Sequence, residues 1–307
     1  MASTASTTAQ LGRLERVLNA RDLAEACPRI KPGRIYRAGN PAHASHKDVL
    51  TLREKLGLRH LLDFRSSNER AEDSAWSLML SNGVVKTYDG GRVSSVSVDH
   101  NAALEGVELH DIELHQLPLL EKSSFIWGLV RRLPLGSLVA GVFWKAFGYE
   151  EKMREQLIPE VNKGGLQLVY EILMETGTEN ILKSLQLLTE GATNHHPQLF
   201  FCKLGKDRTG LLAALVLTAC GASKEEIVAD YARSDGVDDI ALGGIEKERD
   251  MQGIDPKIFS RAPPEAMERL LKHAEERYGG LRRYMEQIGF TREEQDRLCR
   301  SLTEDDW

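Results

Sequence analysis

The chain is poor in cysteine, with four among 307 residues. Cys27, Cys202, Cys220 and Cys299 stand far apart and do not form the closely spaced pairs of a zinc site. This scarcity excludes the dense disulfide framework of a small secreted domain. We therefore expect free thiols in a reducing compartment and place the protein in the cytoplasm.

The histidines lack the neighbours that a metal site needs. His110, His115 and the adjacent His195 and His196 are not accompanied by Cys, Asp or Glu in an arrangement typical of zinc. The sequence therefore predicts no metal and no other cofactor.

Long hydrophobic runs and basic blocks are also missing. The longest charge-free run of the most apolar segment, Leu133–Trp144, contains Pro134 and is shorter than the about 20 apolar residues of a membrane-spanning helix. The net charge of −6, without a long Lys/Arg block, argues against a nucleic-acid partner. The composition is that of a globular protein with enough chain for a large core.

The N-terminal segment, Met1–Gln10, is small and polar and lacks the apolar core of a secretory signal. We expect residues 1–18 to form a disordered tail, with an organelle transit peptide as the alternative. The folded domain is expected over residues 19–307.

The most informative segment is Phe200–Gly210, which reads FFCKLGKDRTG. An apolar stretch precedes Cys202, and a hydrophobic helix pattern follows Arg208, so the segment predicts a strand, a tight loop and a helix. The backbone amides of residues 203–208, the helix N-terminus and the planar Arg208 guanidinium together suit a tetrahedral dianion. The same positive field favours the thiolate of Cys202, which is a strong nucleophile. These features predict hydrolysis of a phosphate monoester through a cysteinyl-phosphate.

The loop resembles the signature of the cysteine-dependent protein tyrosine phosphatase superfamily: Cys, five residues, Arg, then Ser or Thr. Gly205–Gly210 is similar to its bacterial, fungal and plant branch, some of whose members also act on phosphoinositides. The blocks NARDL at 19–23, PGRIYRAG at 32–39 and LLDFRSSNE at 61–69 resemble that branch in order and spacing, and so does YGGLRRYMEQIG at 278–289. The resemblance implies a phosphorylated protein or a phosphoinositide as the substrate.

The resemblance also implies roles for the loop residues. Thr209 would steady the thiolate of Cys202 as the leaving group of the second step. Lys206 would add charge for a second phosphate or a membrane headgroup. The other positions expected to bind the substrate are Lys203, Leu204, Gly205 and Gly210.

The general acid is less clearly marked than the nucleophile. Asp207 would lie beside the phosphate, where repulsion from the dianion favours the protonated acid that a leaving group needs. Asp63, at the end of a predicted strand, is the alternative acid. From the same upstream block we expect Arg65 and Glu69 to form an ion pair that braces the loop.

One residue departs from the family pattern. The residue before the cysteine is usually His, which orients the loop, whereas here it is Phe201. We therefore keep a second hypothesis, a phosphate-binding pseudophosphatase or a binding module for phosphoinositides or phosphoproteins without turnover.

The remaining patterns favour an α/β fold with a central sheet flanked by helices. Strands are predicted at 34–37, 60–64, 84–87 and 108–117, and helices at 45–56 and 211–220, with capping boxes at Ser223 and Thr291. Residues 118–190 are expected to form a helical insertion. Its aromatic segment, Phe125–Phe147, is either a lid near the active site with peripheral membrane contact or a part of the core.

Overall fold

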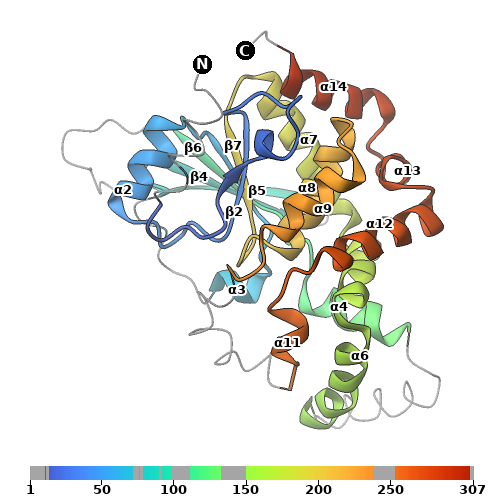
Figure 1. The fold of residues 1–307 in the computed structure, drawn as a ribbon. Coiled ribbons are helices and arrows are strands. Elements are labelled where there is room, and N and C mark those ends of the chain that lie inside the picture. Colours follow the sequence, from blue (N-terminus) through green and yellow to red (C-terminus); the bar gives the residue numbers. More distant parts are fainter. Residues whose placement is uncertain are drawn as a thin grey trace.

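The structure, a computed structural model, describes residues 11, 14–71, 76, 79–89, 92–98, 111–132, 150–237 and 253–304. Within these residues a mixed sheet of seven strands is flanked by helices (Figure 1), so the predicted α/β class is confirmed. The strand order is β1-β2-β7-β3-β6-β4-β5. Strands β2, β7, β3, β6 and β4 run parallel, and the edge strands β1 and β5 pair antiparallel. The strands are β1 (Arg21–Asp22), β2 (Ile35–Ala38), β3 (His60–Asp63), β4 (Gly83–Asp89), β5 (Arg92–Val98), β6 (Ile112–Gln116) and β7 (Gln198–Phe201).

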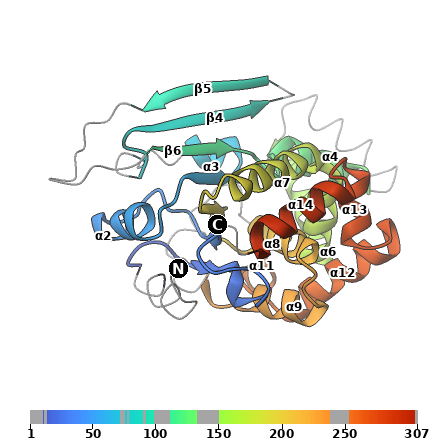
Figure 2. The same cartoon turned by 90° about the horizontal axis from the view of Figure 1, so that it is seen from above.

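Helices cover both faces of the sheet, with most of them on one face (Figure 2). The helices are the 3-10 helix η1 (Leu23–Glu25), α2 (His46–Val49), the π-helical turn η2 (Leu50–Lys55), α3 (Ser67–Ala71), α4 (Lys122–Val130), α6 (Glu150–Thr176), α7 (Thr178–Thr193), α8 (Asp207–Ala219), α9 (Lys224–Ala232), α11 (Pro256–Phe259), α12 (Pro264–Tyr278), α13 (Leu281–Gln287) and α14 (Arg292–Thr303).

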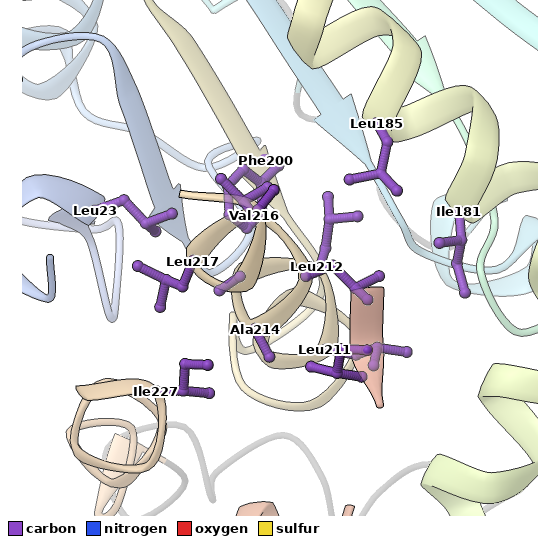
Figure 3. Close-up of a cluster of buried hydrophobic side chains, with 14 of the residues drawn as sticks. Leu23, Ile181, Leu185, Phe200, Leu211, Leu212, Ala214, Val216, Leu217 and Ile227 are labelled. Atoms are coloured by element: carbon purple, nitrogen blue, oxygen red, sulfur yellow. The ribbon is translucent and has the colours of Figure 1, made fainter. Parts of the chain in front are cut away.

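Helix α8 forms the centre of the larger core. It is apolar on all sides, and its side chains pack against the sheet, η1, α7 and α9 (Figure 3). Because side chains alternate along a strand, successive residues of β7 serve different faces. Phe200 packs into the α8 core, whereas Leu199 and Phe201 pack into the smaller core under α2.

Most of the predicted elements are confirmed. Strands β2, β3, β4 and β6 lie inside or close to their predicted ranges, and residues 108–110 fall outside the described residues. The predicted helix at 45–56 forms as α2 followed by η2. The capping boxes at Ser223 and Thr291 are present. The exposed edge strand β5 was not predicted.

The segment expected as a helical insertion contains α4, α6 and α7. Tyr170 and Leu173 of α6 and Ile181 and Leu185 of α7 are buried in the α8 core, so this part of the segment completes the core. Trp127 of α4 is 59% exposed. Trp144 lies outside the described residues. Among the described helices, none is both long and apolar enough to span a bilayer.

The described part of the expected tail packs onto the domain. The amides of Glu15 and Arg16 donate to the Asp48 carboxylate, at 2.7 and 2.9 Å, and Val17 is buried. Packing of the chain therefore begins before Asn19, and residues 1–10 lie outside the described residues.

Candidate active site

The candidate site lies at the carboxyl end of β7, in the middle of the sheet. Cys202 follows β7 directly and is 3% exposed, and α8 begins at Asp207. The loop between them therefore connects a buried strand to the N-terminus of the central helix. A helix end in this position supplies unpaired amides and positive potential.

The close approach of two backbone segments requires glycine at position 205. Gly205 has φ +70°, and a Cβ there would lie 2.4 Å from the carbonyl carbon and oxygen of Ala38. Any other residue would therefore be strained in its backbone and would collide with β2.

The loop carbonyls are held on the outside. The Lys203 carbonyl accepts from the Asn40 amide (3.0 Å), and Asn19 Nδ2 donates to the Leu204 and Gly205 carbonyls (3.0 and 2.9 Å). In a trans peptide unit the C=O and the following N–H point in opposite directions. The amides of residues 204–206 consequently face the inside of the loop, where they could donate hydrogen bonds to a bound dianion.

A buried charged network supports this outer side. Arg37 donates to the Gly205 carbonyl (2.8 Å) and to Asp230, which also accepts from Arg21 (2.7 Å). Burial would raise the pKa of the Asp230 carboxyl, but the two guanidinium groups outweigh it and hold that pKa below its usual value. Asp230 is therefore ionised and ties α9 to β1, β2 and the loop.

Arg208 is oriented by Glu69. The Arg208 Nη1 and Nη2 atoms donate to the two Glu69 oxygens at 2.5 and 2.6 Å, and Nη1 also donates to the Phe64 carbonyl at 3.3 Å. These contacts occupy three of the five guanidinium N–H groups. The Nε–H and the second Nη2–H form the remaining edge, a fork that matches two oxygens of a phosphate.

Glu69 and Arg208 are both ionised. Burial would raise the pKa of the Glu69 carboxyl, but Arg208 and the Ser66 amide lower it to about 2. Burial would likewise lower the pKa of the Arg208 guanidinium, but Glu69, with smaller contributions from Cys202 and Asp207, raises it. Both groups thus stay charged over the whole physiological range.

Thr209 offers a hydroxyl that the fold has left free. The residue is fully buried in the first turn of α8, and its Oγ1 has no hydrogen-bond partner among the described residues. An unpaired buried hydroxyl costs free energy, and such groups often mark a functional site. A thiolate at Cys202 or a bound oxyanion would provide the missing partner.

Asp207 is held by Tyr170, which nothing in the sequence marks as a site residue. Tyr170 Oη of α6 donates to Asp207 Oδ1 (2.8 Å) and lies 2.6 Å from Tyr231 Oη of α9. Burial raises the pKa of Tyr170 well above its usual value, so the residue remains a donor. The Asp207 side chain is 31% exposed and is thus accessible to a substrate from solvent.

Asp63, the alternative acid, forms a buried ion pair with Arg65. It is fully buried and accepts from Arg65 Nε (2.9 Å) and Nη2 (2.7 Å). The expected ion pair of Arg65 with Glu69 is therefore wrong: Arg65 pairs with Asp63, and Glu69 pairs with Arg208. Proximity in sequence misled that prediction, because α3 turns Glu69 toward α8.

The side chains of Lys206 and Phe201, on either side of the loop in sequence, both pack against the protein. The Lys206 ammonium is buried and donates to the carbonyls of Phe259 and Arg261, so it anchors the 259–261 segment to the loop. Phe201 packs on the α2 side of the sheet, with its ring 5.8 Å from Trp76 and 5.5 Å from the Arg65 guanidinium. The side chain before Cys202 therefore points away from the core that contains α8.

Comparison with known proteins agrees with this geometry. The model of the tyrosine phosphatase family matches residues 12–304. A Cupriavidus necator protein named "Putative tyrosine-protein phosphatase" is 27% identical over 224 residues, or 72% of this chain and 61% of the relative. "Triple specificity protein phosphatase PtpB" of Mycobacterium tuberculosis is 26% identical over 221 residues, or 70% and 66%. The matches span less than two thirds of either relative, whereas the family model spans nearly all of this chain, which therefore belongs to the tyrosine phosphatase family.

Proposed function

We propose that the protein hydrolyses phosphate monoesters through a cysteinyl-phosphate. The single observation that carries the proposal is the loop from Cys202 to Arg208: its amides at residues 204–206 face inward, and Glu69 leaves one edge of Arg208 free of other described residues. This arrangement suits the three equatorial oxygens of the phosphoryl group in the transition state of its transfer.

In the first step the Cys202 thiolate attacks phosphorus, and the bond to the ester oxygen breaks. Asp207 gives its proton to the departing oxygen, so that an alcohol or phenol leaves rather than an alkoxide. Tyr170 fixes the position of the Asp207 carboxyl for this transfer.

In the second step water attacks the cysteinyl-phosphate and releases inorganic phosphate. Asp207, now ionised, accepts a proton from that water, and Cys202 leaves as a thiolate. The Thr209 hydroxyl, which lacks another partner among the described residues, would donate to the departing sulfur.

We propose phosphotyrosine in proteins as the first substrate class, which the family membership supports. Phosphoinositides are a second candidate, supported by the exposed Trp127 with the Arg131 guanidinium 5.8 Å from its ring. An aromatic residue beside a cation suits peripheral contact with an anionic lipid surface.

The test compares the parent with Cys202→Ser in the presence of a chelator, on phosphotyrosine peptides, phosphoserine peptides and vesicles containing phosphoinositides. We expect the parent to release phosphate, and the variant to bind the phosphotyrosine peptide without turnover. Binding without turnover by the parent would support the pseudophosphatase alternative, which Phe201 in place of histidine favours. Phosphate release from vesicles alone would move the substrate from proteins to lipids.

A further inference from the structure

Three potential metal ligands converge on one face of the sheet. They are His60 at the start of β3 and Glu113 and His115 on the neighbouring β6. His60 pairs in register with Glu113, and Leu62 pairs with His115, so the three side chains point to the same face. From the sequence His115 carries no sign of a metal site, because His60 becomes its neighbour only through strand register.

The ligand atoms form a nearly equilateral triangle. His60 Nδ1 lies 3.2 Å from His115 Nε2 and 3.5 Å from Glu113 Oε2, and His115 Nε2 lies 3.3 Å from the same oxygen. Ligands on a tetrahedral zinc ion, with bonds of 2.0–2.1 Å, are roughly 3.3–3.4 Å apart. One ion can therefore bind all three atoms with little movement of the side chains.

The outer nitrogen of each histidine is also engaged. His115 Nδ1 lies 2.8 Å from Tyr88 Oη, and His60 Nε2 lies 3.0 Å from His196 Nδ1. Partners of this kind fix the ring orientation of metal-bound histidines in proteins. They direct the inner nitrogens, His60 Nδ1 and His115 Nε2, toward the centre of the triangle.

The surroundings fit a cation with one open position. His115 is buried, whereas the side chains of His60 and Glu113 are 19% and 32% exposed. Water can therefore occupy the fourth coordination position of a tetrahedral ion. The Lys86 ammonium, 2.8 Å from Glu113 Oε2, now supplies the positive charge and would compete with a metal ion.

We propose that His60, Glu113 and His115 bind a divalent transition-metal ion, with Zn²⁺ as the best match to two imidazoles and one carboxylate. The ion would join β3 to β6 and, through Tyr88 and His196, to β4 and to the segment before β7. His60 pairs with Gln198, four residues before Cys202, which corresponds to about 13 Å along the strand. The ion therefore stabilises the sheet and takes no part in the phosphoryl transfer.

The experiment titrates Co²⁺ and Zn²⁺ into the full chain carrying Cys202→Ser, which removes the thiol of the phosphate loop as a competing ligand. Co²⁺ reports the ligands: a tetrahedral site of nitrogen and oxygen gives visible d–d absorption without the near-ultraviolet charge-transfer band of a thiolate. Binding constants come from Zn²⁺ competition, and the melting temperature is followed in parallel.

Three variants and a control make the test specific. Tyr88→Phe should weaken Zn²⁺ binding roughly 10–100-fold, as expected for the loss of a partner behind a ligand. Glu113→Gln should weaken it further, and Lys86→Met should strengthen it, since a competing charge is removed. Glu179→Gln on the exposed start of α7 should change nothing.

The expected result is one Zn²⁺ per chain, d–d absorption without a thiolate band, and a higher melting temperature with metal. The proposal is overturned by absence of binding at micromolar metal, by a thiolate band, or by unchanged affinity in Glu113→Gln. If Glu113→Gln does not fold, unchanged or weaker affinity in Lys86→Met overturns it equally.

Discussion

Glu69 and Arg208 are joined by two hydrogen bonds, of 2.5 and 2.6 Å, which fix the guanidinium before any substrate arrives. The two residues are 139 positions apart and come from α3 and α8. Since a planar fork loses little freedom when it is already oriented, this contact prepares the site for phosphate.

Removing the charge of Glu69 should release Arg208 from this position. We expect Glu69→Gln to lower kcat/KM for an aryl phosphate by roughly 10²-fold, because misplacement of a binding group by about 1 Å has that effect. Glu121→Gln is the matched control, since Glu121 also bonds α3, through Ser67, whereas Arg208 bonds Glu69 and the Phe64 carbonyl instead. Equal losses in both variants would indicate a general effect on α3 instead.

The same pair should stabilise the fold in a pH-dependent manner. The pKa of Glu69 is about 2 in the folded protein, against about 4.3 in an unfolded chain. Its contribution is therefore complete above about pH 4.3 and is lost as the pH falls through 2. Denaturant unfolding should show a constant stability difference between the parent and Glu69→Gln from pH 8 to about 5, shrinking below that. A difference that shrinks already between pH 8 and 6 would contradict the pairing.

The backbone contact at Gly205 gives a third prediction. Gly205→Ala should destabilise the protein by more than the roughly 1–2 kcal/mol of a left-handed alanine and should abolish phosphate binding, because its Cβ meets Ala38 at 2.4 Å. Gly236→Ala separates the two effects, since Gly236 has φ +77° but open space around its Cβ. Thermal unfolding and calorimetry with inorganic phosphate measure both. Phosphate binding by Gly205→Ala at the parental affinity would refute the assigned loop geometry.

The role of Asp207 as general acid can be tested by comparing substrates whose leaving groups differ in their need for a proton. We expect Asp207→Asn to lower kcat/KM, which reports the first step alone, roughly 10²–10⁴-fold for an alkyl phosphate, whose leaving group needs a proton, and far less for a nitrophenyl phosphate. Tyr170→Phe should repeat this dependence on the leaving group with a smaller loss, since it removes the bond that positions the carboxyl.

Tyr284→Phe is the matched control for Tyr170→Phe. It also deletes a buried tyrosine hydroxyl, one bonded to the Met174 carbonyl. It should cost about 0.5–1.5 kcal/mol of stability without altering the leaving-group dependence. If Tyr170→Phe lowers the rates for both substrates equally, its hydroxyl has only a structural role.

The sequence was most informative where the site is local. Cys202, Arg208 and the helix start lie within a few residues, so their spacing predicts one loop. The partners that position these residues come from far along the chain: Tyr170 stands 37 positions before Asp207, in a helix whose pattern marks only an apolar face. Glu69 had a nearer candidate in Arg65, and only the packing of α3 decides between the two.

The fold was predictable for a similar reason. Buried strands such as Ile35–Ala38 and His60–Asp63 are short segments that contain β-prone or apolar residues and have clear ends, and capping boxes mark helix starts directly. The edge strand Arg92–Val98 is exposed and rich in serine, and it is held by pairing with β4, so its own residues carry little signal. Likewise, His60 and Glu113 become neighbours only through strand register.

The most direct test of the central claim is to trap the intermediate. The parent is mixed with an aryl phosphate in the presence of a chelator and quenched with acid within one turnover, and its peptides are examined by mass spectrometry. The account predicts one phosphoryl group on the sulfur of Cys202, absent from Cys202→Ser, which also loses turnover. Turnover in Cys202→Ser comparable to that of the parent, or a phosphoryl group on a different residue, would contradict it.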